Sequence, residues 1–348
     1  MMNDPMTPDT AGAPPRTQAG PFAAADSALA FDLAARLDRV EERLSAAAAQ
    51  SERLPHEASH HLMQAGGKRV RPLLVLLAAQ LGDGAREEVI DAAAAVELIH
   101  LATLYHDDVM DDAPVRRGAP SAHEVWGNSV AILTGDLLFA RASLLSAGLG
   151  PAAVRLQSTT FERLVLGQLA EFTGPTPDED PVAHYLQVLA DKTGSLIAAS
   201  GEFGLRFSGA PEDLIEPLRE YGEKVGVAFQ LADDIIDLTS DAATSGKRPG
   251  TDLRERVPTL PVLYVRRAAA AGDTTAAEVV ARLDGDLTSD EALEAARVAL
   301  AAHPVTQEAR AEARRWADDA IAALEALPDG EVREGLEAFA HQVVERSS

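Results

Sequence analysis

A long apolar run with helical spacing constrains the fold of this chain more than any other feature. Residues 86–112 read REEVIDAAAAVELIHLATLYHDDVMDD and stop before Pro114. Alanine, leucine and glutamate favour helices, whereas strands draw on β-branched and aromatic residues. Aromatic residues make up only 4% of the 348 residues, and no stretch of the sequence shows the strict alternation of a half-buried strand. We therefore predict an all-α fold.

The same spacing recurs along the chain from residue 26 onward. Residues 27–50 repeat apolar positions at intervals of three and four, and residues 70–81, VRPLLVLLAAQL, are apolar enough for a helix buried on all sides. Residues 1–25 are rich in proline, glycine and threonine, so we expect a disordered tail before a single helical domain at 26–348. Further helices are predicted at 129–147, 151–172, 181–208, 212–239, 258–272, 274–283, 289–301, 305–326 and 330–346.

Composition excludes several classes of partner. The formal net charge is −24, whereas nucleic-acid backbones and anionic membrane surfaces attract basic proteins. The sequence has no run of about 18 apolar residues and no secretory signal, so we expect neither a transmembrane segment nor export. Cysteine is absent, which excludes disulfides, thiol nucleophiles and cysteine-ligated metals and fits a reducing cytoplasm.

Two acidic motifs of the form DDxxD follow apolar helical runs. Residues four apart share one helix face, where like charges repel, and the C-terminal end of a helix dipole disfavours anions. A solvated helix end is the alternative interpretation, but two such copies favour a bound cation. Carboxylate oxygens suit Mg²⁺, which prefers to share them with phosphates. The motifs comprise Asp107, Asp108 and Asp111, and Asp233, Asp234 and Asp237.

Basic residues accompany these motifs in a chain that is otherwise acidic. The segment GGKRVRP, residues 66–72, lies at the start of a predicted buried helix, a position that attracts anions. Each basic residue alone is typical of a solvated surface or, for a histidine, of a core. Together they indicate two phosphorylated ligands, one bridged by metal and one held by basic side chains. The remaining members are His100, Arg116, Arg117, Lys192 and Lys247.

These residues resemble the trans-prenyltransferases, or polyprenyl diphosphate synthases, and most of all the actinobacterial long-chain synthases that make quinone side chains. The matching blocks occur in the family's order and cover most of residues 60–265. Arg256 is a departure, because the family usually has glycine after the DLRE segment. The blocks are GGKRVRP (66–72), ELIHLATLYHDDVMDD (97–112), RRG (116–118), WGNSVAILTGD (126–136), GQLAE (167–171), KTGSLI (192–197), GVAFQLADDIID (226–237) and GKRPGTDLRERVPTLP (246–261).

The resemblance implies an all-α, homodimeric, cytoplasmic enzyme with a deep central cavity and three Mg²⁺ ions in each substrate-bound active site. Isopentenyl diphosphate would attack an allylic diphosphate as the latter ionises. Loss of a proton, which the family assigns to the departing diphosphate, would leave a product five carbons longer. Repeated cycles would give an all-trans polyprenyl diphosphate of C30 or longer for menaquinone side chains, which is passed to a membrane enzyme.

The resemblance also implies a role for each matching residue. The principal metal ligands would be Asp107, Asp111 and Asp233, supported by Asp108, Asp234 and Asp237. Isopentenyl diphosphate would be held by Lys68, Arg71, His100 and Arg117, and the allylic diphosphate by Arg116, Lys192 and Lys247. Thr193 and Gln230 would face the reacting carbons.

Small residues before the first motif indicate a long product. Thr103 lies one turn before Asp107, Ala102 is beside it, and Ile99 is a further turn back, where each turn spans about 5.4 Å. Bulky aromatic residues near these positions close the pocket in short-chain relatives. Tyr105 is expected to pack in the core.

Three rival interpretations stay open: a geranylgeranyl or farnesyl diphosphate synthase, a class I terpene cyclase, and a non-catalytic partner subunit.

Overall fold

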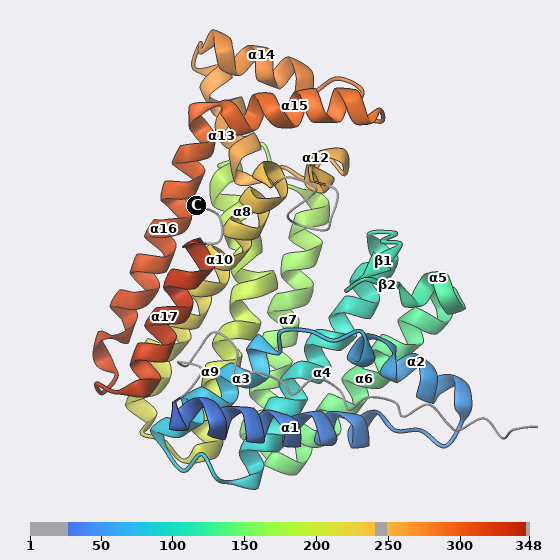
Figure 1. The fold of residues 1–348 in the computed structure, drawn as a ribbon, viewed down its shortest axis with the longest axis vertical. Coiled ribbons are helices and arrows are strands. Elements are labelled where there is room, and N and C mark those ends of the chain that lie inside the picture. The colour runs from blue at the N-terminus through green and yellow to red at the C-terminus, as the bar shows by residue number, and fades with distance from the viewer. Residues whose placement is uncertain (1–26, 241–248, 346–348) are drawn as a thin grey trace, which may run out of the picture.

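The computed structural model describes residues 27–240 and 249–345, which form a bundle of long helices (Figure 1). The predicted all-α fold is confirmed, while the expected tail at 1–25 lies outside the described residues. The first helices are α1 (Ala28–Ala48), α2 (Arg53–Gln64), α3 (Val70–Ala78), α4 (Glu87–Met110), α5 (Ala122–Trp126), α6 (Asn128–Leu149) and α7 (Pro151–Thr173). Those that follow are α8 (Pro181–Leu189), α9 (Ser195–Ser208), α10 (Ile215–Thr239), α12 (Thr251–Arg254), α13 (Leu260–Ala270), α14 (Thr274–Leu283), α15 (Asp290–Ala302), α16 (Pro304–Ala323) and α17 (Glu331–Glu345).

Helix α4 lies at the centre of the bundle. Most of its side chains between Val89 and Tyr105 are buried, and it packs against α1, α3, α6 and α9. A helix that is apolar on every side is stable only where other elements surround it. Helix α10 packs against α9 and α16. Both α4 and α10 run upward in Figure 1, so their C-terminal ends point to the same side of the molecule.

Two helices, α4 and α6, are long and apolar enough to cross a membrane by length and composition alone. A buried core helix passes the same test, and 72% of the apolar window of α4 is buried. The corresponding share for α6 is only 39%. Its outer face leaves Leu133 and Leu144 exposed, so this helix presents an apolar surface.

A second, smaller cluster of buried residues lies among α10, α12, α13, α14 and α15. It includes Leu238, Val265, Val279 and Leu300. Figure 1 shows α14 and α15 together at the upper end of the molecule. Helix α14 begins and ends at the predicted residues, and its start is fixed by the carboxylate of Asp273, which accepts hydrogen bonds from the first free backbone amides.

Two local features depart from the sequence prediction. The helix expected at 181–208 is interrupted by a π-helical turn at Ala190–Gly194, between α8 and α9. A short hairpin, β1 (Val115–Arg116) and β2 (Ala119–Pro120), lies where no strand was predicted. Its turn residues Arg117 and Gly118 have φ angles of 54° and 79°, and positive φ at both positions matches the twist of a tight hairpin.

Candidate active site

The first acidic motif occupies the C-terminal end of α4. Asp107 is partly buried, and Asp111 is the exposed C-cap residue. Asp108 is fully buried, and its Oδ1 accepts a hydrogen bond of 2.6 Å from Nε of Arg116 in β1. The other oxygen of Asp108 is buried and has no hydrogen-bond partner among the described residues. Asp108 therefore anchors Arg116 beside the motif.

The second acidic motif occupies the last two turns of α10. Asp234 is buried, and its carboxylate accepts hydrogen bonds from the Tyr185 hydroxyl and, at 2.9 Å, from Nε2 of Gln230. Asp237 accepts hydrogen bonds from the backbone amides of Thr251 and Asp252, at 3.4 and 3.2 Å. The second motif thus holds the start of α12 in place, and Asp233 is the partly buried residue that precedes these two.

The two motifs lie close to one another. Burial raises the pKa of Glu255, which follows α12, and Asp111 of one motif and Asp237 of the other raise it further. The Glu255 carboxyl is therefore close enough to the ends of both α4 and α10 to interact electrostatically with an aspartate of each motif. Burial also raises the pKa of Asp107 to about 6, while Lys192 opposes this shift. The carboxylates of the two motifs are hereafter called the acidic pole, and the nearness of both motifs to Glu255 is consistent with the shared site predicted from the sequence.

Two further carboxylates belong to this site and were not singled out from the sequence. Burial raises the pKa of Asp252 to about 8, and Asp234 and Asp237 add to the shift. Glu171 in α7 forms an ion pair with Lys192 and raises the pKa of both outer aspartates of the first motif. Their only signal in the sequence was membership of the matching blocks 167–171 and 246–261.

The π-helical turn places Lys192 and Thr193 next to α10. A Cβ atom added to Gly226 of α10 would lie 2.6 Å from Cα of Gly194, so only glycine allows the two backbones to approach this closely. Single π turns within helices are frequent at functional sites. The turn brings Lys192 close enough to Asp107 and Asp111 for its charge to oppose the raised pKa of both carboxyls.

Arg69 and Arg71 lie two residues apart but have different surroundings. Arg69 is 4% exposed, and it pairs with Glu41 and, through Nη1 at 2.9 Å, with the buried Glu97. Burial lowers the pKa of Arg71, although Glu97 opposes the shift. Nε of Arg71 is buried, and no residue in 27–240 or 249–345 forms a hydrogen bond with it. Such a group is normally satisfied by a ligand or by water, so Arg71 suits anion binding and Arg69 is structural.

Arg117 and His100 complete this basic cluster. The Arg117 guanidinium donates hydrogen bonds to the backbone carbonyls of Leu62, at 3.2 Å, and Gly66. It lies against Gly67, where an added Cβ would be only 3.0 Å from Cζ of Arg117. Burial lowers the pKa of His100 well below 6.5, and Arg71 and Arg117 lower it further. His100 is therefore neutral at pH 7 and keeps one N–H to donate.

The remaining predicted residues are placed as follows. Lys68 is exposed, and Lys247 lies outside the described residues. In the presumed chain-length pocket, Ile99 and Ala102 are buried, and Oγ1 of the partly buried Thr103 donates to the carbonyl of His100 at 2.9 Å. The role of Ile99, Ala102 and Thr103 in lining a product tunnel stays a prediction.

Two other side chains have clear structural roles. Tyr105 is fully buried, and its hydroxyl donates to the carbonyl of Ala58 at 2.5 Å, which confirms core packing. Arg256 has a φ of 60°, in the left-handed region that favours glycine. Its Nη2 donates to the carbonyl of Gly285 at 2.9 Å, and this contact holds the side chain that replaces the usual glycine.

The acidic pole fits a hard divalent cation. Its donors are carboxylate oxygens, which such ions prefer. The pKa values of Asp107 and Asp234 are raised to about 6, first by burial and then by neighbouring carboxylates among other groups. A bound cation would relieve both effects.

The comparisons with known proteins agree with this geometry. A family model described as polyprenyl synthetase matches residues 52–297. The nonaprenyl diphosphate synthase of Mycobacterium tuberculosis is 45% identical over 322 residues, which cover 92% of this chain and 95% of that protein. Among solved structures, a decaprenyl diphosphate synthase from Rhodobacter capsulatus has a TM-score of 0.82 and 36% identity, covering 92% of this chain and 98% of that one.

A second solved structure contains ligands. The geranylgeranyl pyrophosphate synthase from Corynebacterium glutamicum, complexed with calcium and isoprenyl diphosphate, has a TM-score of 0.82 and is 43% identical to this chain. The match covers 92% of this chain and 98% of that chain. The likeness therefore extends over nearly the whole molecule, including both acidic motifs.

Proposed function

This chain belongs to the polyprenyl synthetase family and is a prenyltransferase, and we propose that it makes a long-chain all-trans polyprenyl diphosphate of C30 or longer. It would do so by repeated addition of isopentenyl diphosphate to an allylic diphosphate in the cytoplasm. The product would serve menaquinone side chains through a membrane enzyme. The proposal is supported most strongly by the nearness of both DDxxD motifs to Glu255 and by the arginines that surround His100.

The acidic pole and its cations would bind the allylic diphosphate. Asp107, Asp111 and Asp233 would hold Mg²⁺, which when bound supplies positive charge that offsets the charge developing on the departing diphosphate. Arg116, which Asp108 anchors at 2.6 Å, and Lys192 would orient the same diphosphate. Because Asp108 already holds Arg116 in place, this arginine would stabilise the charge separation without reorganising. Lys192 would exchange its ion pair with Glu171 for the diphosphate.

The basic cluster would bind isopentenyl diphosphate. Arg71 offers a buried Nε that has no hydrogen-bond partner within the described structure, and Arg117 is fixed by two backbone carbonyls. His100, neutral because its pKa is lowered by burial and by the surrounding arginines, would donate one N–H to a phosphate oxygen. The apolar side chains of α4 would exclude water, which would otherwise quench the allylic cation.

Two observations bear on product length. The long-chain assignment is supported by similarity to a nonaprenyl and a decaprenyl diphosphate synthase and by the small residues Ala102 and Thr103. The 43% identity to a geranylgeranyl pyrophosphate synthase favours a shorter product as the second candidate. Mass analysis of products from farnesyl diphosphate and labelled isopentenyl diphosphate with Mg²⁺ separates them. Products of C30 or longer support the proposal, and a product that stops at C20 overturns it.

The same preparation tests the two remaining alternatives. A non-catalytic partner subunit would show no turnover when the purified chain is assayed alone. A terpene cyclase would release a hydrocarbon from geranylgeranyl diphosphate without isopentenyl diphosphate. We expect turnover in the first assay and no hydrocarbon in the second.

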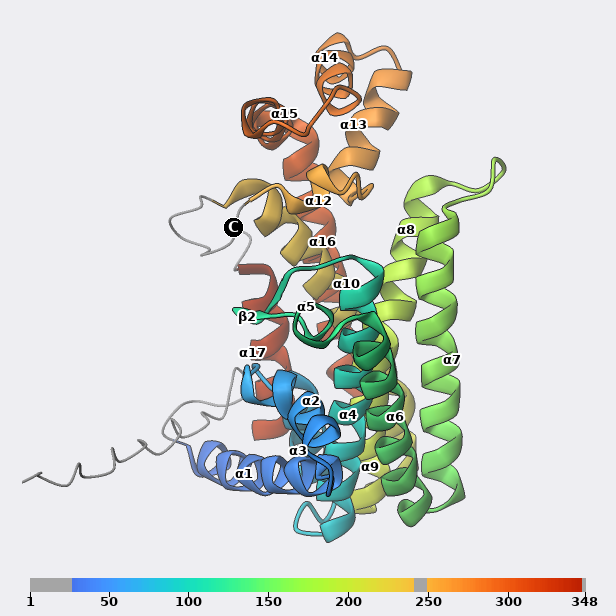
Figure 2. The same cartoon turned by 90° about the vertical axis from the view of Figure 1, so that its right-hand side faces the viewer.

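We propose a homodimer formed through the outer face of α6 and α7, which lie side by side in Figure 2. Leu133, Leu144, Leu166, Leu169 and Phe172 are more than half exposed there, and apolar surface of this kind marks an interface. Light scattering should report a dimer for the natural chain and a monomer for Leu166→Glu combined with Leu169→Glu. Leu54→Glu, at an exposed position of α2, is the matched control and should remain dimeric.

A further inference from the structure

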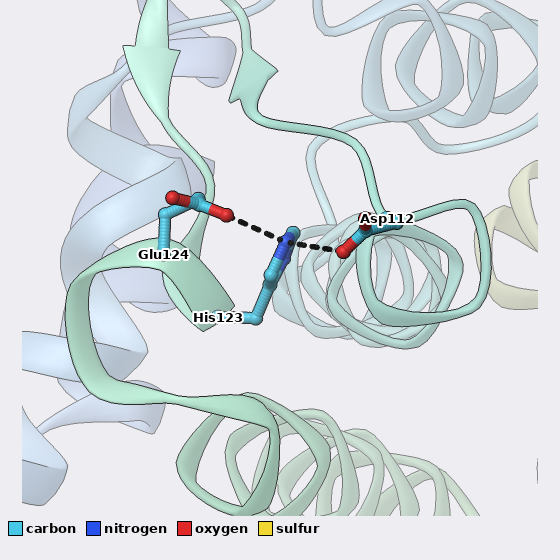
Figure 3. Close-up of side chains that lie close together, drawn as sticks. All are labelled: Asp112, His123 and Glu124. Atoms are coloured by element: carbon cyan, nitrogen blue, oxygen red, sulfur yellow. Dashed lines mark ion pairs between the residues drawn. The ribbon is translucent and has the colours of Figure 1, made fainter.

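A second group of side chains that can bind a metal lies beside the β1–β2 hairpin, here called the basic hairpin because it carries Arg116 and Arg117. This group is outside the site described above. It consists of Asp112, the residue after the first acidic motif, and of His123 and Glu124 in α5 (Figure 3). One ligand atom of each residue lies within 4.8 Å of the other two.

The imidazole of His123 is buried and unsatisfied. Its side chain is 4% exposed, and both ring nitrogens are buried with no hydrogen-bond partner in the part of the chain that the structure describes. Leaving a buried polar group unpaired costs about 1–3 kcal/mol. Figure 3 shows that the ring lies between the carboxylates of Asp112 and Glu124. The unsatisfied nitrogen therefore faces two anionic groups from different segments of the chain.

The distances within this group fit a shared ion better than a shared proton. Nε2 of His123 lies 3.4 Å from Oε1 of Glu124 and 3.7 Å from Oδ1 of Asp112. An N–H···O hydrogen bond spans about 2.7–3.2 Å. Nitrogen and oxygen ligands bind zinc at about 2.0–2.2 Å, which separates two ligand atoms of a tetrahedron by roughly 3.3–3.6 Å. The observed separations are close to this range.

We propose that Asp112, His123 and Glu124 bind a divalent cation of the zinc class, with water completing the coordination. An imidazole ligand favours Zn²⁺ over Mg²⁺, which prefers oxygen ligands. The ion would join the end of α4 to α5 and close the segment between residues 112 and 123. That segment includes the hairpin with Arg116 and Arg117, so the bound ion would fix these arginines relative to the acidic pole.

The test is calorimetric titration of the full chain with Zn²⁺ in excess Mg²⁺, because Mg²⁺ occupies oxygen-only sites but competes poorly for the imidazole. Three variants are compared with the natural chain: His123→Gln, Asp112→Asn and, as matched control, His341→Gln at an exposed position of α17. Asp112 is 98% exposed, so its substitution leaves the fold intact even if His123→Gln does not fold. Co²⁺ absorption in the visible range gives an independent readout of a four- or five-coordinate ion.

We expect the natural chain and His341→Gln to bind one more equivalent of Zn²⁺ than His123→Gln. In Asp112→Asn, the affinity for this additional Zn²⁺ should fall by about tenfold or more. Both His123→Gln and Asp112→Asn should lose the visible Co²⁺ band. Equal stoichiometry and affinity in the natural chain and Asp112→Asn would overturn the proposal. So would a natural chain that takes up no Zn²⁺ beyond the amount bound by His123→Gln.

Discussion

Asp108 Oδ1 and Arg116 Nε are joined by a hydrogen bond of 2.6 Å that links the first acidic motif to the basic hairpin. Asp108 is fully buried, so it is poorly placed to face a ligand, whereas the side chain of Arg116 is 31% exposed. The middle aspartate of the motif therefore positions a cation, and the outer two are left to face the site. Two of the three carboxylates are thus available to a metal ion, while the third holds Arg116 in position.

Replacing Asp108 by asparagine should weaken its hydrogen bond to Arg116 without changing the size or shape of the side chain. The charge-assisted hydrogen bond becomes a neutral one, which is roughly half as strong. We expect turnover to fall by about tenfold and the free energy of unfolding by about 1–2 kcal/mol, measured by steady-state assay and urea unfolding. Asp38→Asn, at an exposed position of α1, should change neither quantity. An unaltered turnover in Asp108→Asn would show that Arg116 does not depend on this contact.

Arg69 and Lys68 are neighbours in the sequence, but we expect substitution of Arg69 to reduce stability and substitution of Lys68 to impair substrate binding. Arg69→Gln removes the guanidinium that donates to Glu97, which is 2% exposed, and so takes away the ion pair of this buried carboxylate. Loss of one partner of a buried pair costs about 3–5 kcal/mol, which urea unfolding should detect. Lys68→Ala, at an exposed position, should leave stability nearly unchanged and raise the KM for isopentenyl diphosphate. If Lys68→Ala were the destabilised variant and Arg69→Gln the stable one, the assignment would be reversed.

The raised carboxyl pKa values predict how stability depends on pH without metal. Burial raises the pKa of Asp107 and Asp234 to about 6 and of Asp252 to about 8, from 3.8. The folded protein thus binds protons more tightly than the unfolded chain at these groups. Their contribution to stability is complete below pH 3.8 and is lost as pH rises through 6 and then 8.

Mg²⁺ should therefore raise the thermal midpoint more at pH 8 than at pH 6, because protons compete with the ion at the lower pH. Differential scanning calorimetry with EDTA or with Mg²⁺ measures this difference. Asp252→Asn should flatten the pH dependence of the metal-free protein between pH 6 and 8. A midpoint shift by Mg²⁺ that is the same at both pH values would contradict the assignment of these carboxylates to the metal site.

Thr103→Phe should shorten the product. Its aromatic ring would fill the space one turn before Asp107, where we expect the growing tail, and leave the first condensation intact. Mass analysis of the products should show a shift toward short chains at a similar rate of initial turnover. Thr103→Val keeps the size of the side chain and should retain the natural distribution. The pocket placement fails if Thr103→Phe and the natural chain give the same distribution.

The sequence predicted the main helices well and the local details of the site poorly. The long apolar run before Pro114 located α4, whereas periodicity located α14, whose apolar face and flanking residues agree with the helix period. It did not reveal the π turn at Ala190–Gly194, because a shift of one hydrogen bond leaves the apolar pattern almost unchanged. Nor could it separate Arg69 from Arg71, because burial depends on Glu41 and Glu97 from other helices.

The carboxylate of Asp252 illustrates the same limit. It belongs to no acidic motif, and its position depends on Asp237, which accepts a hydrogen bond from its backbone amide. Such a contact between α10 and α12 is a property of the folded chain. By contrast, each DDxxD motif was visible because its two outer aspartates share one helix face.

The central claim is that paired carboxylates on α4 and α10 hold the metal that draws diphosphate from the allylic substrate. The turnover number of Asp107→Ala, measured with Mg²⁺ in a chain whose circular dichroism matches the natural protein, tests it most directly. We predict a loss of about 1,000-fold, with Asp38→Ala unaffected. Turnover within a few fold of the natural chain would contradict the claim.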